Sequence, residues 1–411
     1  MTLNEDFLQL LREQLDEEEI KSFLEEMDRP SPVSIRGCGE RSEASKAPSM
    51  GGVLGEAKRN SIIPWCGEGV YLDQRPRFTL DPLFHAGAYY VQEASSMFIS
   101  YVLRHIMNSD ERYRTASLCC LDLCAAPGGK STILINDLPV GSRIICNDIN
   151  RKRACVLHEN ISKWCAYRQE EYGLPSDTIV VTNNRPQDFQ AMGDEAFDLI
   201  LCDVPCSGEG MFRKDEDAVK MWSRQNVELC QRRQREIVSD VWNTLRRGGF
   251  MIYSTCTYNR FEDEDNVRWI CEELGGEVVN LNVPKEWNIT GEGMYHFYPH
   301  RVKGEGFFCA LIRREVREER EVRGEREVRE VGGRRRGLTL ELNRYDDDTP
   351  RYEVSREVAL QYLHGDVLRL SQDAPKGLLL ITYCHHPLGL VKNIGARANN
   401  LYPKAWRIRN V

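Results

Sequence analysis

Short apolar runs in the middle of the chain alternate with longer stretches of helical character. The runs lie at residues 117–123, 143–149, 178–183, 197–204, 249–256 and 307–312. Each run is short and apolar throughout, which is typical of a strand buried on both faces. Helix-like stretches such as Arg151–Cys165 and Ala218–Leu245 lie between them. This alternation predicts an α/β fold with a doubly wound, mostly parallel sheet.

The length of 411 residues predicts two or three domains. The segments on either side of the alternating region differ from it in amino-acid composition. The first 30 residues are acidic and predict one or two amphipathic helices; they lack the order of charges of a signal peptide. Residues 37–60 are small and polar, which predicts a flexible insertion. Residues 313–336 carry ten Arg and seven Glu and predict a charged linker or a solvated helix.

The amino-acid composition indicates which cellular compartment and which kinds of site to expect. No run of 18 or more apolar residues is present, so we expect no membrane-spanning helix. The chain has 15 cysteines, several of them on apolar runs, which is typical of reduced thiols in the cytoplasm. No C-x-x-C pair occurs, so we expect no structural zinc and no other metal site.

Charge is distributed unevenly along the chain. The net charge is −8, and residues 1–30, with ten acids and three bases, account for −7 of it. The last 25 residues carry five bases and no acid, interleaved with Tyr402 and Trp406. Such a stripe can follow a phosphate backbone and stack on bases, or it can be a solvated basic tail. Composition alone leaves both interpretations open.

A glycine turn follows the first apolar run of the middle region. Ala125–Ser131 contains Pro127, Gly128 and Gly129, which allow a ligand to approach the backbone before a helix begins near Lys130. The turn matches neither G-x-G-x-x-G nor a complete phosphate loop. Asp148 ends the second run, where an acid can bind ribose hydroxyls. Alternatively, Asp148 or Asn150 could cap the next helix. The glycine turn and Asp148 together indicate a site for a nucleoside cofactor.

Two cysteines follow two of the apolar runs. Cys206 comes after run 197–204 and Cys256 ends run 249–256, so both are expected at the carboxyl edge of the sheet, where ligands bind. A thiolate that adds to carbon 6 of cytosine makes carbon 5 nucleophilic toward a methyl sulfonium, and elimination later restores the ring. That chemistry needs an attacking thiolate, an acid near ring nitrogen 3 and help with product release. Cys206, Asp203 and Cys256 can supply these groups, although a buried cysteine is more often a small apolar residue.

Several strings together resemble a known family. LDLCAAPGGKS, NDINRKR, LCDVPCSGEGMFRKD and STCTYN occur in the order and spacing of the Sun-type RNA (cytosine-5)-methyltransferases, which include bacterial RsmB and RsmF. FHAGAYYVQEASSM at 84–97 is similar to the segment before the family's first strand. HRVKGEGFF at 300–308 and LGLVKNIGARANNLYP at 388–403 resemble the RsmF branch. The resemblance covers most of 60–312 and the last 65 residues.

The resemblance implies a domain plan. It places an N-terminal α/β RNA-binding extension at 1–83 and an S-adenosylmethionine-dependent catalytic domain at 84–312. The catalytic domain would have the class I, Rossmann-like fold with a seven-stranded sheet. A linker at 313–345 and a small, β-rich, PUA-like RNA-binding domain at 346–411 would complete the chain.

The resemblance also implies residue roles. Cys256 would attack carbon 6, Cys206 would assist product release or proton removal, and Asp203 would hold the cytosine edge. Lys130 would reach the active site from the glycine turn, although its position also suits an ordinary surface residue. The cofactor S-adenosylmethionine would be bound by Cys124, Ala125, Ala126, Pro127, Gly128, Gly129, Lys130, Asp148 and Asp203. In the C-terminal domain we expect RNA contacts from Lys392, Arg397, Lys404 and Arg407.

One position departs from the family's pattern. Arg185 stands after the third strand, where the family usually carries an acid near the adenine. A guanidinium has no acceptor, so either Asn184 or Asp188 takes that role or the cofactor is held more weakly.

The expected substrate is an unpaired cytosine in small-subunit ribosomal RNA, acted on by a monomer. Transfer RNA is the alternative substrate, and a non-catalytic RNA-binding assembly factor on the same fold is the alternative function. A nicotinamide dehydrogenase is disfavoured by the glycine pattern. A DNA cytosine methyltransferase would use the Pro-Cys cysteine as its nucleophile and would not need a second.

Overall fold

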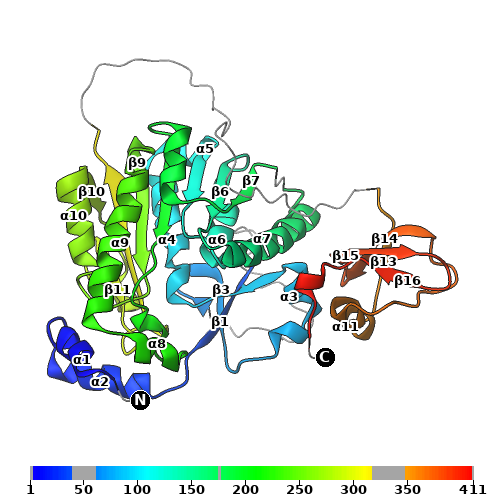
Figure 1. Ribbon diagram of the computed structural model, residues 1–411, viewed down its shortest axis with the longest axis horizontal. Helices are drawn as coiled ribbons and strands as arrows, with labels where there is room; N and C mark the ends of the chain where they lie inside the picture. The colour runs from blue at the N-terminus through cyan, green and yellow to red at the C-terminus, as the bar shows by residue number, and fades with distance from the viewer. Residues whose placement is uncertain (1–2, 39–61, 175–176, 317–347, 410–411) are drawn as a thin grey trace.

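The computed structural model describes residues 3–38, 62–174, 177–316 and 348–409 (Figure 1). The predicted insertion at 37–60 and the predicted linker at 313–345 lie almost wholly outside these residues. None of the helices in the described ranges is both long and apolar enough to cross a membrane.

A mixed sheet forms the centre of the molecule. Its strands include β5 (Cys119–Asp122), β6 (Arg143–Asn147), β7 (Ile179–Thr182), β8 (Phe197–Asp203), β9 (Leu245–Thr255) and β12 (Phe307–Arg314). These six strands coincide with the six predicted runs. The order is β10-β12-β9-β8-β5-β6-β7, and all neighbours from β9 to β7 are parallel. The predicted α/β class with a mostly parallel sheet is confirmed.

The antiparallel edge holds two further strands. β10 (Gly276–Val279) pairs with Leu311–Arg314 of β12, and β11 (Met294–Phe297) pairs with Phe307–Ala310. The two short strands therefore follow one another along the same edge of β12. Eight strands occupy seven positions, which agrees with the seven-stranded sheet that the family resemblance implied.

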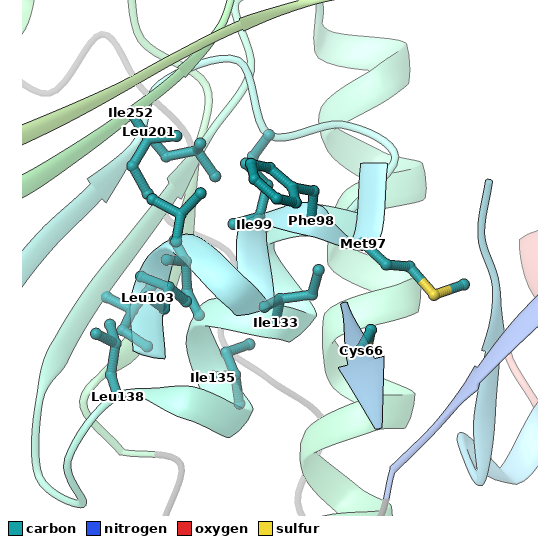
Figure 2. Packing of buried hydrophobic residues seen from close by; sticks show 14 of the residues in the cluster. Cys66, Met97, Phe98, Ile99, Leu103, Ile133, Ile135, Leu138, Leu201 and Ile252 are labelled. Atoms are coloured by element: carbon teal, nitrogen blue, oxygen red, sulfur yellow. The ribbon is translucent and has the colours of Figure 1, made fainter. Parts of the chain in front are cut away.

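Alternate side chains of the parallel strands enter two different cores. Leu201 of β8 faces a layer that also contains Leu103 and Ile133 (Figure 2). Ile200, the preceding residue, belongs to the other core. The first layer is formed by α4 (Ile99–Ser109), α6 (Gly129–Asp137) and α7 (Arg151–Tyr172). The second is formed by α9 (Arg224–Trp242) and α10 (Glu264–Leu274). The shorter helices are α3 (Pro82–Ala86), α5 (Glu111–Thr115) and α8 (Glu216–Met221).

The acidic N-terminal segment forms the predicted helices. They are α1 (Glu5–Arg12) and α2 (Glu17–Met27), and Asp16 and Glu19 form a capping box at the start of α2. Phe7 and Phe23 pack against Phe212 and Tyr258, which lie in the region of the central sheet. A four-stranded antiparallel sheet of order β2-β3-β1-β4 follows. Its strands are β1 (Val33–Gly37), β2 (Ile62–Ile63), β3 (Cys66–Leu72) and β4 (Tyr89–Val91).

The C-terminal segment forms a small sheet with its own core, seen at the right of Figure 1. Its elements are β13 (Arg351–Glu353), α11 (Arg356–His364), β14 (Gly377–Tyr383), β15 (His386–Asn393) and β16 (Ala398–Asn400). This unit docks on α7, where Arg351 forms a two-pronged ion pair with Glu170 and the His386 ring lies 4.5 Å from that of Tyr167. The contacts hold it directly against the helices that cover the central sheet.

Candidate active site

The loops that follow β8 and β9 meet at the carboxyl edge of the sheet. Asp203 at the end of β8 is in register with Ser254 of β9, so the residues just beyond these strands lie side by side. The Sγ atoms of Cys206 and Cys256 are 3.2 Å apart, and the backbone N–H of Cys256 donates to Cys206 Sγ at 3.4 Å. The structure thus brings together the two thiols that the sequence placed at two strand ends.

Cys206 lies in a protected environment beside Cys256. The pKa of Cys206 is raised well above its ordinary value, first by its hydrogen bond to Cys256 and then by burial. Either sulfur can donate in the Sγ–Sγ contact, so the geometry alone does not give the two thiols separate roles.

An ion pair lies beside the cysteines. Nζ of Lys130, in the first turn of α6, is 2.8 Å from Oδ2 of Asp203, and the hydroxyl of Ser254 donates to Oδ1 of the same carboxylate at 2.8 Å. Burial alone would lower the pKa of Lys130, but Asp203 and, to a lesser extent, Cys256 outweigh it and raise that pKa. Lys130 is therefore a charged residue of the site and not an ordinary surface lysine.

The glycine turn is fixed by side chains from other elements. The Ala126–Pro127 peptide bond is cis, and Gly128 has φ +114°, where only glycine is unstrained. The carbonyl of Pro127 accepts from Tyr90 at 3.0 Å and from Asn160 at 2.8 Å. Both residues lie outside the turn, on β4 and α7, so the turn has a rigid shape before any ligand binds.

The sequence left open whether Asp148 or Asn150 caps the helix that follows β6. Asn150 caps α7 by accepting from the backbone N–H of Lys152 at 3.0 Å. Asp148 is buried at the end of β6, where Oδ1 accepts from the N–H of Asn150 at 2.8 Å and Oδ2 lies 3.4 Å from Arg153. Asn150 is therefore the helix cap, both carboxylate oxygens of Asp148 have protein partners, and the contact of Asp148 with ribose hydroxyls stays a prediction.

The structure distinguishes the two residues that could replace the acid missing at Arg185. Arg185 is exposed, and its backbone N–H donates to Asp188 Oδ2 at 2.8 Å. Asp188 is therefore engaged as a local cap. Asn184 instead lies beside Asn147 at the same sheet edge as Asp148, because its N–H donates to Asn147 Oδ1 at 2.8 Å. Which of the two residues takes the missing role stays a prediction.

Sequence reasoning missed buried polar residues around the site. Asp122, at the end of β5, accepts from Ser131 at 2.6 Å, and burial raises its pKa to about 7. Arg36 reaches from β1 to the start of α6, where its guanidinium donates to the carbonyl of Gly129 at 3.4 Å. An acid inside an apolar run was a usable signal for Asp122. Nothing in the local pattern pointed to Arg36.

Three of the four predicted RNA contacts in the C-terminal domain are exposed: Lys392, Arg397 and Lys404. Arg407 is half-buried and donates to the carbonyl of Tyr402 at 3.4 Å. Tyr402 belongs to the core, so the expectation that it stacks on bases is not supported. Trp406 is half-buried, and the centroid of its ring lies 5.3 Å from Nζ of Lys163 on α7. This contact lies at the interface between the C-terminal unit and α7.

Three family descriptions match consecutive parts of the chain. Residues 3–94 match "N-terminal domain of 16S rRNA methyltransferase RsmF", residues 113–313 match "16S rRNA methyltransferase RsmB/F", and residues 349–408 match "Methyltransferase RsmF PUA domain". The three matches follow one another in the order of the structural units described above.

Curated relatives carry a consistent description. The ribosomal RNA small subunit methyltransferase F of Shigella flexneri serotype 5b is 29% identical over 419 residues, which cover 83% of this chain and 84% of the relative. The protein of the same description from Escherichia fergusonii is 36% identical over 262 residues, covering 61% and 51%.

Solved structures share the fold. NSun6 from Pyrococcus horikoshii with SFG is 18% identical with a TM-score of 0.58, covering 76% of this chain and 98% of that one. A methyltransferase homolog protein from the same organism is 22% identical with a TM-score of 0.55, covering 75% and 98%. At these identities the likeness concerns the fold alone.

Proposed function

Because the chain belongs to the RsmB/F family of 16S rRNA methyltransferases, we propose that it methylates carbon 5 of a cytosine in small-subunit ribosomal RNA. The observation that carries this proposal is the 3.2 Å contact between Cys206 and Cys256, with the charged Lys130 beside them. Addition of a thiolate to a pyrimidine needs one attacking sulfur, and a second thiol can manage the protons of the later steps.

Each residue of the site has a separate part in this proposal. Cys256, whose sulfur lies 3.2 Å from that of Cys206 and near the Lys130 ammonium, adds its sulfur to carbon 6 of the base. Asp203 accepts hydrogen bonds from the cytosine edge. Once carbon 5 carries the methyl group, its proton passes to water, the electron pair of that C–H bond forms the C5–C6 double bond, and the bond between sulfur and carbon 6 breaks with its pair on sulfur. Cys206 then gives its proton to the departing thiolate of Cys256 and regains a proton from water.

The residues at the edge of β5 and β6 fit S-adenosylmethionine. Asp148 is a buried carboxylate at a strand end, where it can accept from ribose hydroxyls, and the turn Cys124–Gly129 gives close access to backbone N–H groups. S-adenosylmethionine, when bound, supplies an electrophilic methyl group. Lys130 and Asp203 lie between this turn and the cysteines, so we assign them to both parts of the site.

Bisulfite sequencing tests the proposal. Small-subunit RNA from cells that lack the gene is incubated with the purified protein and S-adenosylmethionine, and cytosines that resist deamination are mapped. We expect one newly resistant cytosine in ribosomal RNA. Resistance in transfer RNA only would move the substrate, and methylation without any resistant cytosine would contradict the proposal.

The C-terminal domain is proposed to hold the RNA. The double variant Lys392→Glu with Arg397→Glu reverses two exposed charges and should remove phosphate contacts. We expect RNA binding to weaken about tenfold at 0.15 M salt. The slope of log K against log salt concentration should become smaller by about 1 to 2. Filter binding across a salt series measures both values. The matched control reverses Arg114 and Lys285, which are exposed on the catalytic domain. An equal loss in both variants would mean that net charge and not a local surface is responsible.

A further inference from the structure

The carboxylate of Glu209 is completely buried between the two cysteine loops. Glu209 lies three residues after Cys206, yet Oε2 accepts hydrogen bonds from the residues that directly follow Cys256. These are the hydroxyl of Thr257 at 2.5 Å and the backbone N–H groups of Tyr258 at 2.7 Å and Asn259 at 3.1 Å. A side chain of the first loop thus holds the backbone of the second.

The other oxygen of Glu209 is also saturated. Oε1 accepts from the indole N–H of Trp222 at 2.9 Å and from the side-chain amide of Asn259 at 2.9 Å. That amide also lies 2.9 Å from Glu262, whose carboxylate accepts the backbone N–H of Ser207 at 3.0 Å. Burial, followed by the charge of Glu209, raises the pKa of Glu262 to about 7. Two buried acids therefore connect the residue after Cys206 with the residues after Cys256.

The two loops also contact each other directly through Gly210. The N–H of Gly210 donates to the carbonyl of Cys256 at 2.8 Å. A Cβ atom at Gly210 would lie 2.7 Å from the carbonyl oxygen of Gly306, which is closer than such atoms approach, and 3.0 Å from that of Cys256, which is tighter than most such contacts. The residue next to Glu209 therefore lies in direct contact with the backbone of the cysteine proposed to attack.

We propose that Glu209 is a positioning residue that keeps Cys256 in register with Cys206, an inference that rests on the proposed function. All of its close partners are donors, and an ionised carboxylate offers acceptors only. Glutamine has nearly the same shape, but its NH₂ group would face donors and push the second loop away. A displacement near 1 Å of a reacting group costs roughly 100-fold in rate.

The test compares Glu209→Gln with Glu216→Gln, an exposed glutamate of α8 that forms a surface ion pair with Lys220. The first readout is the initial rate of the covalent protein–RNA adduct with 5-fluorocytosine RNA. The second needs no RNA: diamide oxidises two neighbouring thiols to a disulfide and is itself reduced to the hydrazine. Mass spectrometry of the peptides that contain Cys206 and Cys256 follows this bond.

For Glu209→Gln we expect adduct formation roughly 100-fold slower and disulfide formation about tenfold slower, because the sulfur atoms no longer meet. Affinity for S-adenosylmethionine and protection of the buried Cys202 and Cys230 from alkylation should stay unchanged, as should every readout in Glu216→Gln. Wild-type rates of both reactions in Glu209→Gln would overturn the proposal.

A second variant covers a folding defect. Alkylation of Cys202 in Glu209→Gln would indicate a folding defect. In that case Glu209→Asp tests the positioning role, because aspartate keeps an acceptor-only group on a side chain one methylene shorter. Intermediate rates with Cys202 protected would support positioning, and wild-type rates would overturn it. If the wild-type protein oxidises its thiol pair but forms no RNA adduct, the proposed function fails, and the disulfide rates alone still decide the role of Glu209.

Discussion

Cys256→Ala is expected to abolish methyl transfer and the covalent RNA adduct, whereas Cys206→Ala is expected to accumulate that adduct. Without Cys256 no sulfur can add to carbon 6, so the loss should reach about 10⁴-fold or more, as for other covalent nucleophiles. Without Cys206 the addition still occurs, but the later release lacks its proton donor. The 3.2 Å contact between the two sulfur atoms, with the Lys130 ammonium in the field of Cys256, gives the structural reason for this order.

The two outcomes can be separated on a denaturing gel. Labelled RNA that remains attached to the protein after boiling reports the adduct, and release of methylated RNA is followed in parallel. Cys155→Ala, at an exposed position on α7, is the matched control and should behave as the wild type. An adduct in Cys256→Ala together with none in Cys206→Ala would exchange the two roles and bring the enzyme closer to the pattern of DNA cytosine methyltransferases.

The central sheet could be predicted because its signal is local. A strand buried on both faces must be apolar along its whole length, and the six runs satisfied this condition independently of their neighbours. β10 and β11 gave no such signal, since both lie at the edge of the sheet and are only four residues long. Their shared position on β12 depends on pairing, which no run of residues displays by itself.

The chemistry of the site could be predicted only in part, for a related reason. Cys206, Cys256 and Asp203 follow strands, and the topology of a parallel sheet brings such residues to one edge. Glu209 sits in an ordinary polar loop, and its role depends on donors about 50 residues away in the chain. The docking of the C-terminal domain could not be predicted either, because it depends on Glu170 and Arg351, which are 181 positions apart in the chain.

Lys130→Met is expected to slow adduct formation by about 10²- to 10³-fold, the usual effect of removing one preorganised electrostatic group. Lys130 is half-buried beside Asp203, and Cys256 contributes to its raised pKa, so the ammonium and the sulfur lie within each other's field. Methionine keeps most of the length but removes the charge, whose nitrogen lies 5.1 Å from the centroid of the Phe307 ring. The variant also leaves Asp203 without its cation, which further disfavours a second negative charge nearby.

The sign of the pH effect distinguishes this electrostatic role from a structural one. A nearby cation favours the thiolate, so without it a higher pH is needed to form the same amount of thiolate. Alkylation of Cys256 by iodoacetamide, followed by peptide mass spectrometry without RNA or cofactor, should therefore move to higher pH in Lys130→Met. Lys130→Arg should restore much of the wild-type profile, and Lys285→Met, at an exposed position, should not change it. A profile that stays at the wild-type pH in Lys130→Met, even with a slow adduct, would mean that Lys130 positions the substrate instead of activating the sulfur.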